Sequence, residues 1–433
     1  MTLVVEPFVT MRGAIEVPSV KGICQRGVLL GAIADGESEV RGFGRAADTE
    51  SAISVVRQLG VEVTDVADDV VRIQGKGLRG LVAPAEPLDC GNAGTLMRLV
   101  AGILAGQEGE FTLIGDESLS SRPQERIAVP LREMGATIDA TDGHAPLTIH
   151  GGGLHPIEYE LPVASAQVKS TILFAGLFAD DGPTTVVEPA VTRDHTERML
   201  TAMGARVTRA HGKSSVWPVE SLQPLSIDVP GDISSAAPFI VAATLLPDAV
   251  LHIRNVNVNP TRTGLLDVLH RMGGRVAVYN RRTVSGEPVA DLEVRYAELT
   301  ATHIYGPEVP LLVDELPLIC LLASMARGVT RIRGAEELRA KETDRIATTT
   351  EALHAVGAHL QASDDGFRIR GVPTRIRGGV VESRGDHRIA MLGAIAGLVS
   401  AEGVEIEDAE CVAVSFPGFF DILDSLRAAS VGA

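Results

Sequence analysis

The chain has 433 residues, of which 45% are hydrophobic and 3% aromatic, and its formal net charge at pH 7 is −17. A chain of this length usually folds as more than one domain. The negative charge repels phosphate backbones and stacking rings are scarce, so we expect no nucleic-acid partner. We find no signal peptide and no apolar run of membrane-spanning length, and therefore expect a cytoplasmic protein without a membrane partner.

The cysteines at positions 24, 90, 320 and 411 form no CxxC pair, which favours reduced thiols over disulfides or metal ligands. No spacing of histidines with carboxylates indicates a metal site. No glycine-rich stretch has the strand-to-helix context of a phosphate or dinucleotide loop. The sequence therefore predicts no metal site.

An apolar helix precedes each of six short strands. In chain order, the helices are predicted at residues 20–36, 91–106, 164–179, 231–246, 314–326 and 385–399, and the strands at 36–43, 109–116, 182–189, 248–255, 328–335 and 403–410. The strands recur about every 66 to 80 residues, a period typical of duplicated supersecondary units. Five units continue with a second helix that ends at a glycine-bearing turn. We predict an α/β fold of α-β-α-β-β units, with sheets outside and helices that are apolar on most faces inside.

The ends of the chain predict how these units are grouped. The sixth unit lacks its trailing strands, whereas residues 1–18 have strand character but no unit of their own. The simplest solution is that residues 1–18 complete the sixth unit. We therefore predict a discontinuous first domain of residues 1–19 and 229–433 and a second domain of residues 20–228. Each domain has three units, and the hinge lies near residues 18–21 and 228–232.

The starts of the six apolar helices carry more polar groups than a cap requires. Lys21, Arg26 and Arg388 are cations at helix N-termini, where the helix dipole disfavours them unless an anion is bound there too. For Ser234 and Thr95, a role as helix caps and a role in ligand binding are equally good explanations.

Further cations follow the strands. The segment KETDR places Lys341, Glu342 and Arg345 at i, i+1 and i+4, so Lys341 and Arg345 are predicted to share a helix face with Glu342 beside them. In isolation this would be a solvated, salt-bridged helix start. The equivalent loops of other units supply Arg122 and Arg193, which indicates a ligand with more than one anionic group.

Several segments, in chain order, closely resemble the enolpyruvyl transferase family, and within it the bacterial-type 5-enolpyruvylshikimate-3-phosphate (EPSP) synthases. These segments read GNAGTLMRL, SLSSRPQER, SAQVKS, TRDHTERML, PGDISSAA, DELPL, LRAKETDRI, GDHRIAM and SFPGFF. The resemblance covers essentially the whole chain. It implies a two-domain inside-out α/β barrel with three repeats per domain. It also implies that the domains close on phosphoenolpyruvate and shikimate 3-phosphate, without a metal or organic cofactor.

The resemblance also implies roles for individual residues. The phosphoenolpyruvate-binding residues would be Lys21, Gly94, Arg122, Gln167, Arg345 and Arg388. The acceptor-binding residues would be Arg26, Ser165, Ala166, Gln167, Arg193, Asp314 and Lys341. The catalytic residues would be Lys21, Asp314, Lys341 and Glu342, and which of them moves which proton stays open. The implied reaction transfers the enolpyruvyl group to the 5-hydroxyl of shikimate 3-phosphate with release of phosphate, in the shikimate pathway of aromatic amino-acid biosynthesis.

One departure from the family pattern concerns the acceptor. The usual opening PG-[DS]-K-S-[IV]-[ST]-x-R reads PSVKGICQR here, so Gly22 stands where the family has a serine that faces the acceptor. A paralogue that acts on a different phosphorylated alcohol or nucleotide therefore stays an alternative, as does an inactive, anion-binding scaffold. In each case we expect small anionic ligands and a monomer.

Overall fold

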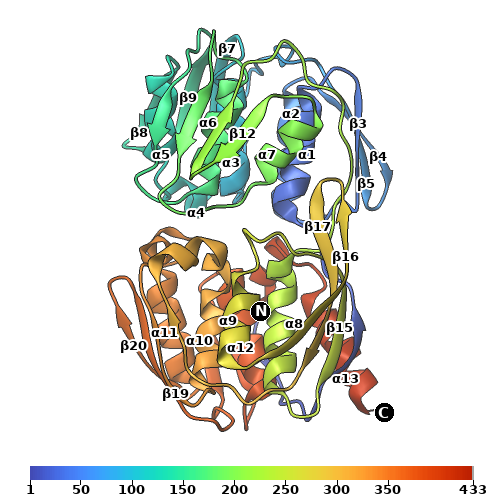
Figure 1. The fold of residues 1–433 in the computed structure, drawn as a ribbon, viewed down its shortest axis with the longest axis vertical. Coiled ribbons are helices and arrows are strands. Elements are labelled where there is room, and N and C mark those ends of the chain that lie inside the picture. Colours follow the sequence, from blue (N-terminus) through green and yellow to red (C-terminus); the bar gives the residue numbers. More distant parts are fainter. Residues whose placement is uncertain (432–433) are drawn as a thin grey trace. The chain divides into compact units, whose positions relative to one another are not determined.

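The computed structural model describes residues 1–431, which divide into two compact units (Figure 1). Among these residues, unit 1 comprises 1–18, 230–282 and 288–431, and unit 2 comprises 19–229 and 283–287. The sequence had assigned residues 283–287 to the first domain. They form the turn of a long hairpin and pack with unit 2, and nothing in the local pattern indicated this contact.

Unit 2 contains three repeats. Its elements are α1 (Lys21–Ala32), β3 (Glu37–Arg41), α2 (Ala47–Gln58), β4 (Glu62–Ala67), β5 (Val70–Gln74), β6 (Leu88–Asp89), α3 (Gly94–Leu104), β7 (Gly109–Ile114), α4 (Glu117–Ser120), α5 (Glu125–Glu133), β8 (Thr137–Thr141), β9 (His144–Gly151), β10 (Glu158–Glu160), α6 (Ala166–Gly176), β11 (Thr184–Val187), α7 (His195–Ala202), β12 (Val207–Ala210), β13 (Lys213–Val216) and β14 (Ser226–Asp228).

Unit 1 contains the other three repeats and the N-terminal strands. Its helices are α8 (Ile233–Leu245), α9 (Gly264–Met272), α10 (Leu316–Ser324), α11 (Arg345–Ala355), α12 (His387–Val399) and α13 (Phe419–Val431), with 3₁₀ turns η1 (Gly306–Leu311), η2 (Val313–Glu315), η3 (Glu336–Ala340) and η4 (Ala409–Val414). Its strands are β1 (Leu3–Val5), β2 (Arg12–Ile15), β15 (Val250–Asn257), β16 (Arg275–Val284), β17 (Glu287–Arg295), β18 (His303–Ile304), β19 (Gly328–Ile332), β20 (His359–Ser363), β21 (Gly366–Gly371), β22 (Gly379–Glu382) and β23 (Val404–Glu407).

The strands of residues 1–431 form six small sheets, five with four strands and one with three. The sheet β14-β3-β5-β4 is representative: β14 lies parallel to β3, and the remaining pairs are antiparallel. The α-β-α-β-β order is confirmed. The parallel strand that precedes each of the apolar helices after α1 was missed, because strands as short as β6 and β18, of two residues each, carry no alternating pattern.

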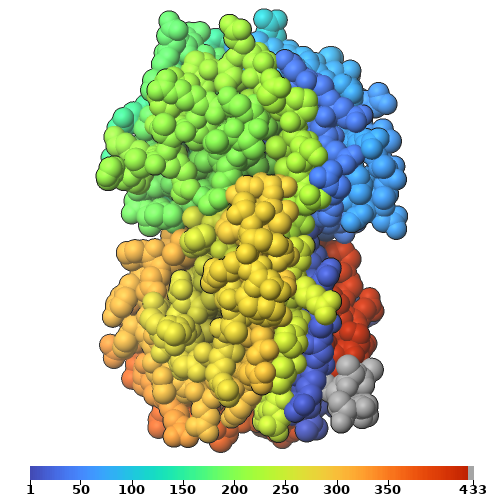
Figure 2. Space-filling model, turned by 45° about the vertical axis from the view of Figure 1, so that its right-hand side comes forward, coloured from blue at the N-terminus to red at the C-terminus, as the bar shows by residue number. Residues whose placement is uncertain are grey.

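Residues 1–18 contribute to two sheets. Strand β1 pairs antiparallel with β23 and completes the sixth sheet, whereas β2 pairs in parallel with β15. In the lower part of Figure 2, these N-terminal residues (dark blue) form a surface strip beside the yellow-green residues of unit 1. The N-terminal segment therefore completes the last repeat with its first strand only.

A left-handed glycine follows the second helix in five repeats. After α2, α5, α7, α9 and α11, the chain turns at Gly60, Gly135, Gly204, Gly273 and Gly357, whose φ angles lie between 86° and 106°. Residues with a Cβ rarely adopt this conformation, so glycine ends each helix and lets the next strand begin.

The predicted apolar helices form the interior of each unit. Within residues 1–431, α1, α3 and α6 contribute to one buried hydrophobic cluster, and α8, α10 and α12 to the other. In α12 every residue except Arg388 is buried. Each unit thus has its apolar helices inside and its sheets outside (Figure 1). No helix in the described part of the chain is long and apolar enough to span a membrane.

Candidate active site

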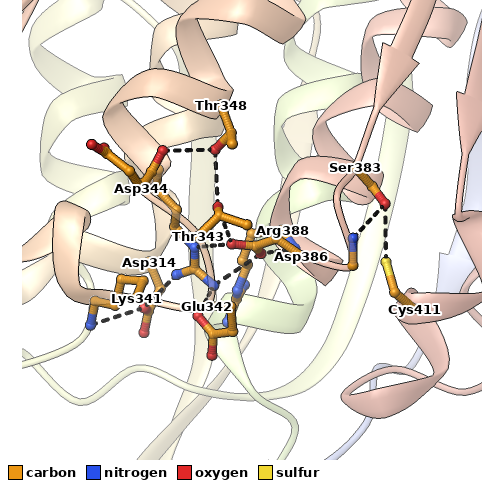
Figure 3. Close-up of polar contacts among 12 residues, drawn as sticks. Asp314, Lys341, Glu342, Thr343, Asp344, Thr348, Ser383, Asp386, Arg388 and Cys411 are labelled. Carbon is orange, nitrogen blue, oxygen red and sulfur yellow. Dashed lines mark hydrogen bonds and ion pairs between the residues drawn. The ribbon is translucent and has the colours of Figure 1, made fainter. Parts of the chain in front are cut away.

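A cluster of charged side chains in unit 1 forms where η2, α11 and α12 begin (Figure 3). Arg345, the first residue of α11, is buried at its centre. Its Nε lies 2.8 Å from Asp386 Oδ2 and its Nη2 lies 2.6 Å from Glu342 Oε2. Its Nη1 lies 3.5 Å from Asp314 Oδ1. Three carboxylates from separate segments therefore converge on one guanidinium.

These carboxylates keep Arg345 charged. Desolvation alone would lower its pKa, but Asp386, Glu342 and Asp314 outweigh it and raise the pKa above its ordinary value. For Asp386, burial acts in the direction that disfavours the charged carboxylate and would raise its pKa. The attraction of Arg345 is stronger, so the pKa of Asp386 is lowered. The pair is ionised at neutral pH, and Asp386 also caps α12 by accepting the backbone N–H of Arg388.

Lys341 is the second cation near Asp314, with its Nζ 3.9 Å from Asp314 Oδ1. Desolvation lowers the pKa of Lys341, and the carboxylates of Asp314 and Glu342 only partly offset this effect. An ammonium with a lowered pKa gives up a proton more easily, so this site offers a proton-exchanging group beside a carboxylate.

The predicted shared helix face of Lys341 and Arg345 is wrong. Lys341 is extended, with φ −92° and ψ −161°, and α11 begins only at Arg345. Asp344 sets this boundary, because its side chain accepts the backbone N–H groups of Ile346 and Ala347. Lys341 and Arg345 nevertheless approach the same carboxylate, that of Asp314.

Arg388 and Ser234 connect α12 to α8. The Arg388 Nη1 donates to the backbone carbonyl of Ser234 at 3.1 Å. Asp232, rather than Ser234, caps α8, by accepting the Ser234 N–H at 2.8 Å. The Ser234 hydroxyl instead donates to the buried Glu315.

In unit 2, Lys21 is the first residue of α1 and is held by Asp48. Its Nζ lies 2.6 Å from Asp48 Oδ2, and Gln25 Nε2 donates to the Asp48 backbone carbonyl at 2.9 Å. The sequence missed Asp48, although its place in the first turn of α2 is typical for an acidic residue.

Arg26 lies deeper in unit 2 and connects three helices. Its Nε donates to Thr196 Oγ1 at 2.7 Å on α7, and its Nη2 to Ser170 Oγ at 3.0 Å on α6. Its Nη1 donates to the Gly22 carbonyl at 2.9 Å. A Cβ at Gly22 would lie 3.3 Å from that same Nη1, which is a tight contact.

The starts of α3 and α6 lie side by side in unit 2. Gln167 accepts a hydrogen bond from Arg98 and donates to Thr95 Oγ1 at 2.9 Å. Thr95 is not a cap, because the N-cap position of α3 is Ala93. A Cβ at Gly94 would lie 3.2 Å from Nη1 of the buried Arg122.

Three further predicted residues lie in unit 2. Ser165 caps α6 by accepting the Val168 N–H at 3.4 Å, and Ala166 is the first residue of that helix. Arg193 is half-buried in the loop before α7. The predicted site residues thus fall into two sets, one in each unit.

Beneath the α6 and α7 starts, unit 2 contains buried ion pairs that the sequence did not predict. The fully buried Lys169 Nζ lies 3.1 Å from Glu188 Oε2 and 2.8 Å from Glu197 Oε1. These partners are 19 and 28 residues away in the sequence, and no local pattern connects them.

A second buried group nearby has the composition of a metal site. Asp194, His195 and Glu287 have ligand atoms within 4.8 Å of one another. Asp194 is, however, paired with Arg198 and Arg209, which supply positive charge where a cation would bind. This set therefore fits an ion-pair network better than a metal site.

The fold of the chain is that of the enolpyruvyl transferases. It aligns with a solved EPSP synthase from Acinetobacter baumannii at a TM-score of 0.87, with 41% identity and 98% of each chain covered. It also aligns with the enolpyruvyl transferase NikO from Streptomyces tendae at a TM-score of 0.78, covering 98% of this chain and 97% of NikO. Because identity to NikO is only 19%, that second similarity concerns the fold alone.

Comparison with known sequences shows to which family of enolpyruvyl transferases the chain belongs. The model of the EPSP synthase (3-phosphoshikimate 1-carboxyvinyltransferase) family matches residues 5–423. A 3-phosphoshikimate 1-carboxyvinyltransferase from Pelobacter propionicus is 48% identical over 425 residues, 98% of each chain. Another from Acidithiobacillus ferrooxidans is 50% identical over 415 residues, 96% of this chain and 95% of that protein. The chain belongs to the EPSP synthase family.

Proposed function

We propose that this protein transfers the enolpyruvyl group of phosphoenolpyruvate to the 5-hydroxyl of shikimate 3-phosphate and releases inorganic phosphate, as a transferase of the shikimate pathway. The observation that carries the proposal is the similarity to 3-phosphoshikimate 1-carboxyvinyltransferases along almost the whole chain. The charged cluster around Arg345 supports it, because the reaction needs an acid and a base among cations.

The cations bind and neutralise the two substrates. Lys21, Arg122, Arg345 and Arg388 bind the phosphate and carboxylate of phosphoenolpyruvate, together with Gly94 and Gln167. Arg26, Ser165, Ala166, Gln167 and Arg193 bind the acceptor. Fixed cations that surround both anions offset their mutual repulsion and stabilise the phosphate as it leaves.

Acid–base chemistry belongs to Lys21, Asp314, Lys341 and Glu342. The acceptor hydroxyl loses its proton to Asp314 or Lys341 while its oxygen bonds to C2 of phosphoenolpyruvate, and C3 takes up a proton from Glu342. A proton then leaves C3, the C2–O bond to phosphate breaks, and the double bond re-forms in the product. The 3.9 Å between Lys341 Nζ and Asp314 Oδ1 lets these two groups serve one hydroxyl.

The chemistry of these residues also defines the partners. Phosphoenolpyruvate and a phosphorylated acceptor are both small anions. We propose that the protein acts on them in the cytoplasm as a monomer, without nucleic acid or a membrane surface.

Gly22 is the observation that favours a second candidate, an enolpyruvyl transferase for a different phosphorylated alcohol or nucleotide. Without a side chain here, the Arg26 Nη1 lies against the Gly22 carbonyl, and no hydroxyl is available to the acceptor.

A phosphate-release assay over a panel of acceptors tests both candidates. The purified protein, with phosphoenolpyruvate, is mixed in turn with shikimate 3-phosphate, other phosphorylated alcohols and nucleotide sugars. The proposal predicts release with shikimate 3-phosphate at the rate of an ordinary enzyme, about 10 per second. Faster release with another acceptor would establish the second candidate instead.

A further inference from the structure

A buried polar cluster in unit 1 lies outside the residues proposed to bind or react. It consists of Asp232, Ser234, Arg262 and Glu315, and we refer to it as the Arg262 node. These side chains come from three segments: the start of α8, the loop before α9, and the end of η2. Each residue is at most 7% exposed.

The members of the node form one chain of hydrogen bonds. Arg262 Nη2 lies 2.9 Å from Asp232 Oδ1 and 2.6 Å from Ser234 Oγ. The Ser234 hydroxyl in turn donates a hydrogen bond to Glu315 Oε1. The hydroxyl is therefore the bridge between the guanidinium and the buried carboxylate.

Such a node is a weak way to stabilise a fold. Removing charges from water costs free energy that their attraction only partly returns, and apolar groups of similar volume are often as stable. Burial raises the pKa of Glu315, as does the nearby charge of Asp314. Arg388, Arg262 and the Ser234 hydroxyl act in the opposite direction. Because burial of the Glu315 carboxylate costs free energy, we infer that this side chain serves to position another residue.

The residue that Glu315 can place is Asp314, its neighbour in the chain. Both lie in η2, a 3₁₀ turn of only three residues. In this turn the backbone N–H of Glu315 donates a hydrogen bond to the carbonyl of Leu312 at 3.0 Å. One turn of this kind is poorly rigid by itself. The Asp314 carboxylate must nevertheless hold its position 3.5 Å from Arg345 and 3.9 Å from Lys341.

We propose that Arg262 is a positioning residue which, through Ser234 and Glu315, fixes the η2 turn so that the Asp314 carboxylate faces Lys341 and Arg345. This inference rests on the proposed function, because it assigns the node to the acid–base step. The Ser234 backbone carbonyl also receives Arg388, so the node adjoins a phosphoenolpyruvate-binding residue without using the same atom.

Ser234→Ala separates the two connections. The substitution removes the bridging hydroxyl but keeps the carbonyl that Arg388 uses and the N–H that Asp232 accepts. We expect kcat to fall by about tenfold to a hundredfold, since small misplacements of a catalytic group have effects of this size. The KM for phosphoenolpyruvate should stay within about twofold. Ser324→Ala is the matched control, because it removes a buried serine hydroxyl that bonds only within α10.

Arg262 itself is tested by a pair of variants. Arg262→Met leaves the buried Asp232 carboxylate without its paired cation and Glu315 without its bridged cation, and can fail to fold for that reason alone. Arg262→Met/Asp232→Asn/Glu315→Gln removes all three charges and keeps a side-chain oxygen to cap α8, so its Tm should return to within a few degrees of wild type while kcat stays at least about tenfold lower. A triple variant with wild-type Tm and kcat within about twofold of wild type would show that the node serves folding only, and would overturn the proposal.

The same measurements distinguish a failure of the proposed function from a failure of the positioning role of Arg262. A wild-type protein that releases no phosphate with shikimate 3-phosphate would overturn the proposed function, and this inference with it. An active wild type whose Ser234→Ala and Ser324→Ala variants share its kcat would overturn the positioning role alone.

Discussion

Replacing Lys169 with methionine should strongly destabilise unit 2. The ammonium has no exposed surface and lies between Glu188 and Glu197, which are at most 5% exposed. Methionine keeps the apolar stem but leaves two buried carboxylates without their shared cation. Breaking a buried pair from one side costs about 3–5 kcal/mol. For a unit of about 200 residues, 1 kcal/mol corresponds to about 2–4 °C in Tm, so we expect a loss of about 6–20 °C.

Lys213→Met is the control for this prediction. Lys213 pairs with Glu158 at 2.7 Å in the same unit, but the two side chains are 48% and 61% exposed. An exposed pair contributes at most about 1 kcal/mol. Differential scanning calorimetry of both variants and wild type measures the Tm of each transition. Equal losses for the two variants would refute the reasoning from burial.

Three further predictions concern the proposed catalytic and acceptor residues. Glu342→Gln and Lys21→Met should each lower kcat by at least about a hundredfold without unfolding the protein. Near-normal turnover of Glu342→Gln in a phosphate-release assay would contradict the proposed proton route. Gly22→Ser should change kcat/KM for shikimate 3-phosphate by at most about tenfold, the range of one hydrogen bond, even though its Cβ would meet the Arg26 Nη1 at 3.3 Å. A larger loss would indicate a different acceptor. Lys341→Met should lose activity but gain stability at neutral pH. The pKa of Lys341 is lowered in the folded state, so the unfolded state binds more protons and wild-type stability rises with pH toward 10.5. Urea unfolding from pH 7 to 10 should show the advantage of the variant shrinking with pH, and a constant difference would contradict the lowered pKa.

The repeat architecture was readable from the sequence because its signals are local. Six apolar helices and five glycine turns recur with one period, and both depend on residues within a few positions of each other. The two-residue strand Leu88–Asp89 has no such local signal, because its position is determined by pairing with β7. The grouping of residues 283–287 with unit 2 depends on tertiary contacts in the same way, and no local pattern indicates it.

The roles of the predicted site residues stay predictions, and most of the contacts that these residues make could not be predicted from the sequence. The helix-face prediction for Lys341 and Arg345 failed although a local signal was present: Asp344 precedes Arg345 and is a preferred N-cap residue. The Arg262–Ser234–Glu315 connection had no such signal, because its members are separated by 28 and 81 residues. Pairing at that distance is decided by the packed fold.

Product formation in heavy water tests the central claim most directly. The protein is mixed with phosphoenolpyruvate and shikimate 3-phosphate in D₂O, and the products are followed by ³¹P and ¹H NMR. The account predicts one inorganic phosphate for each acceptor consumed. It also predicts deuterium in the vinyl group of the product, because C3 takes up a solvent-derived proton and then loses one. Phosphate release without loss of the acceptor, or a product whose vinyl group carries no deuterium, would contradict it.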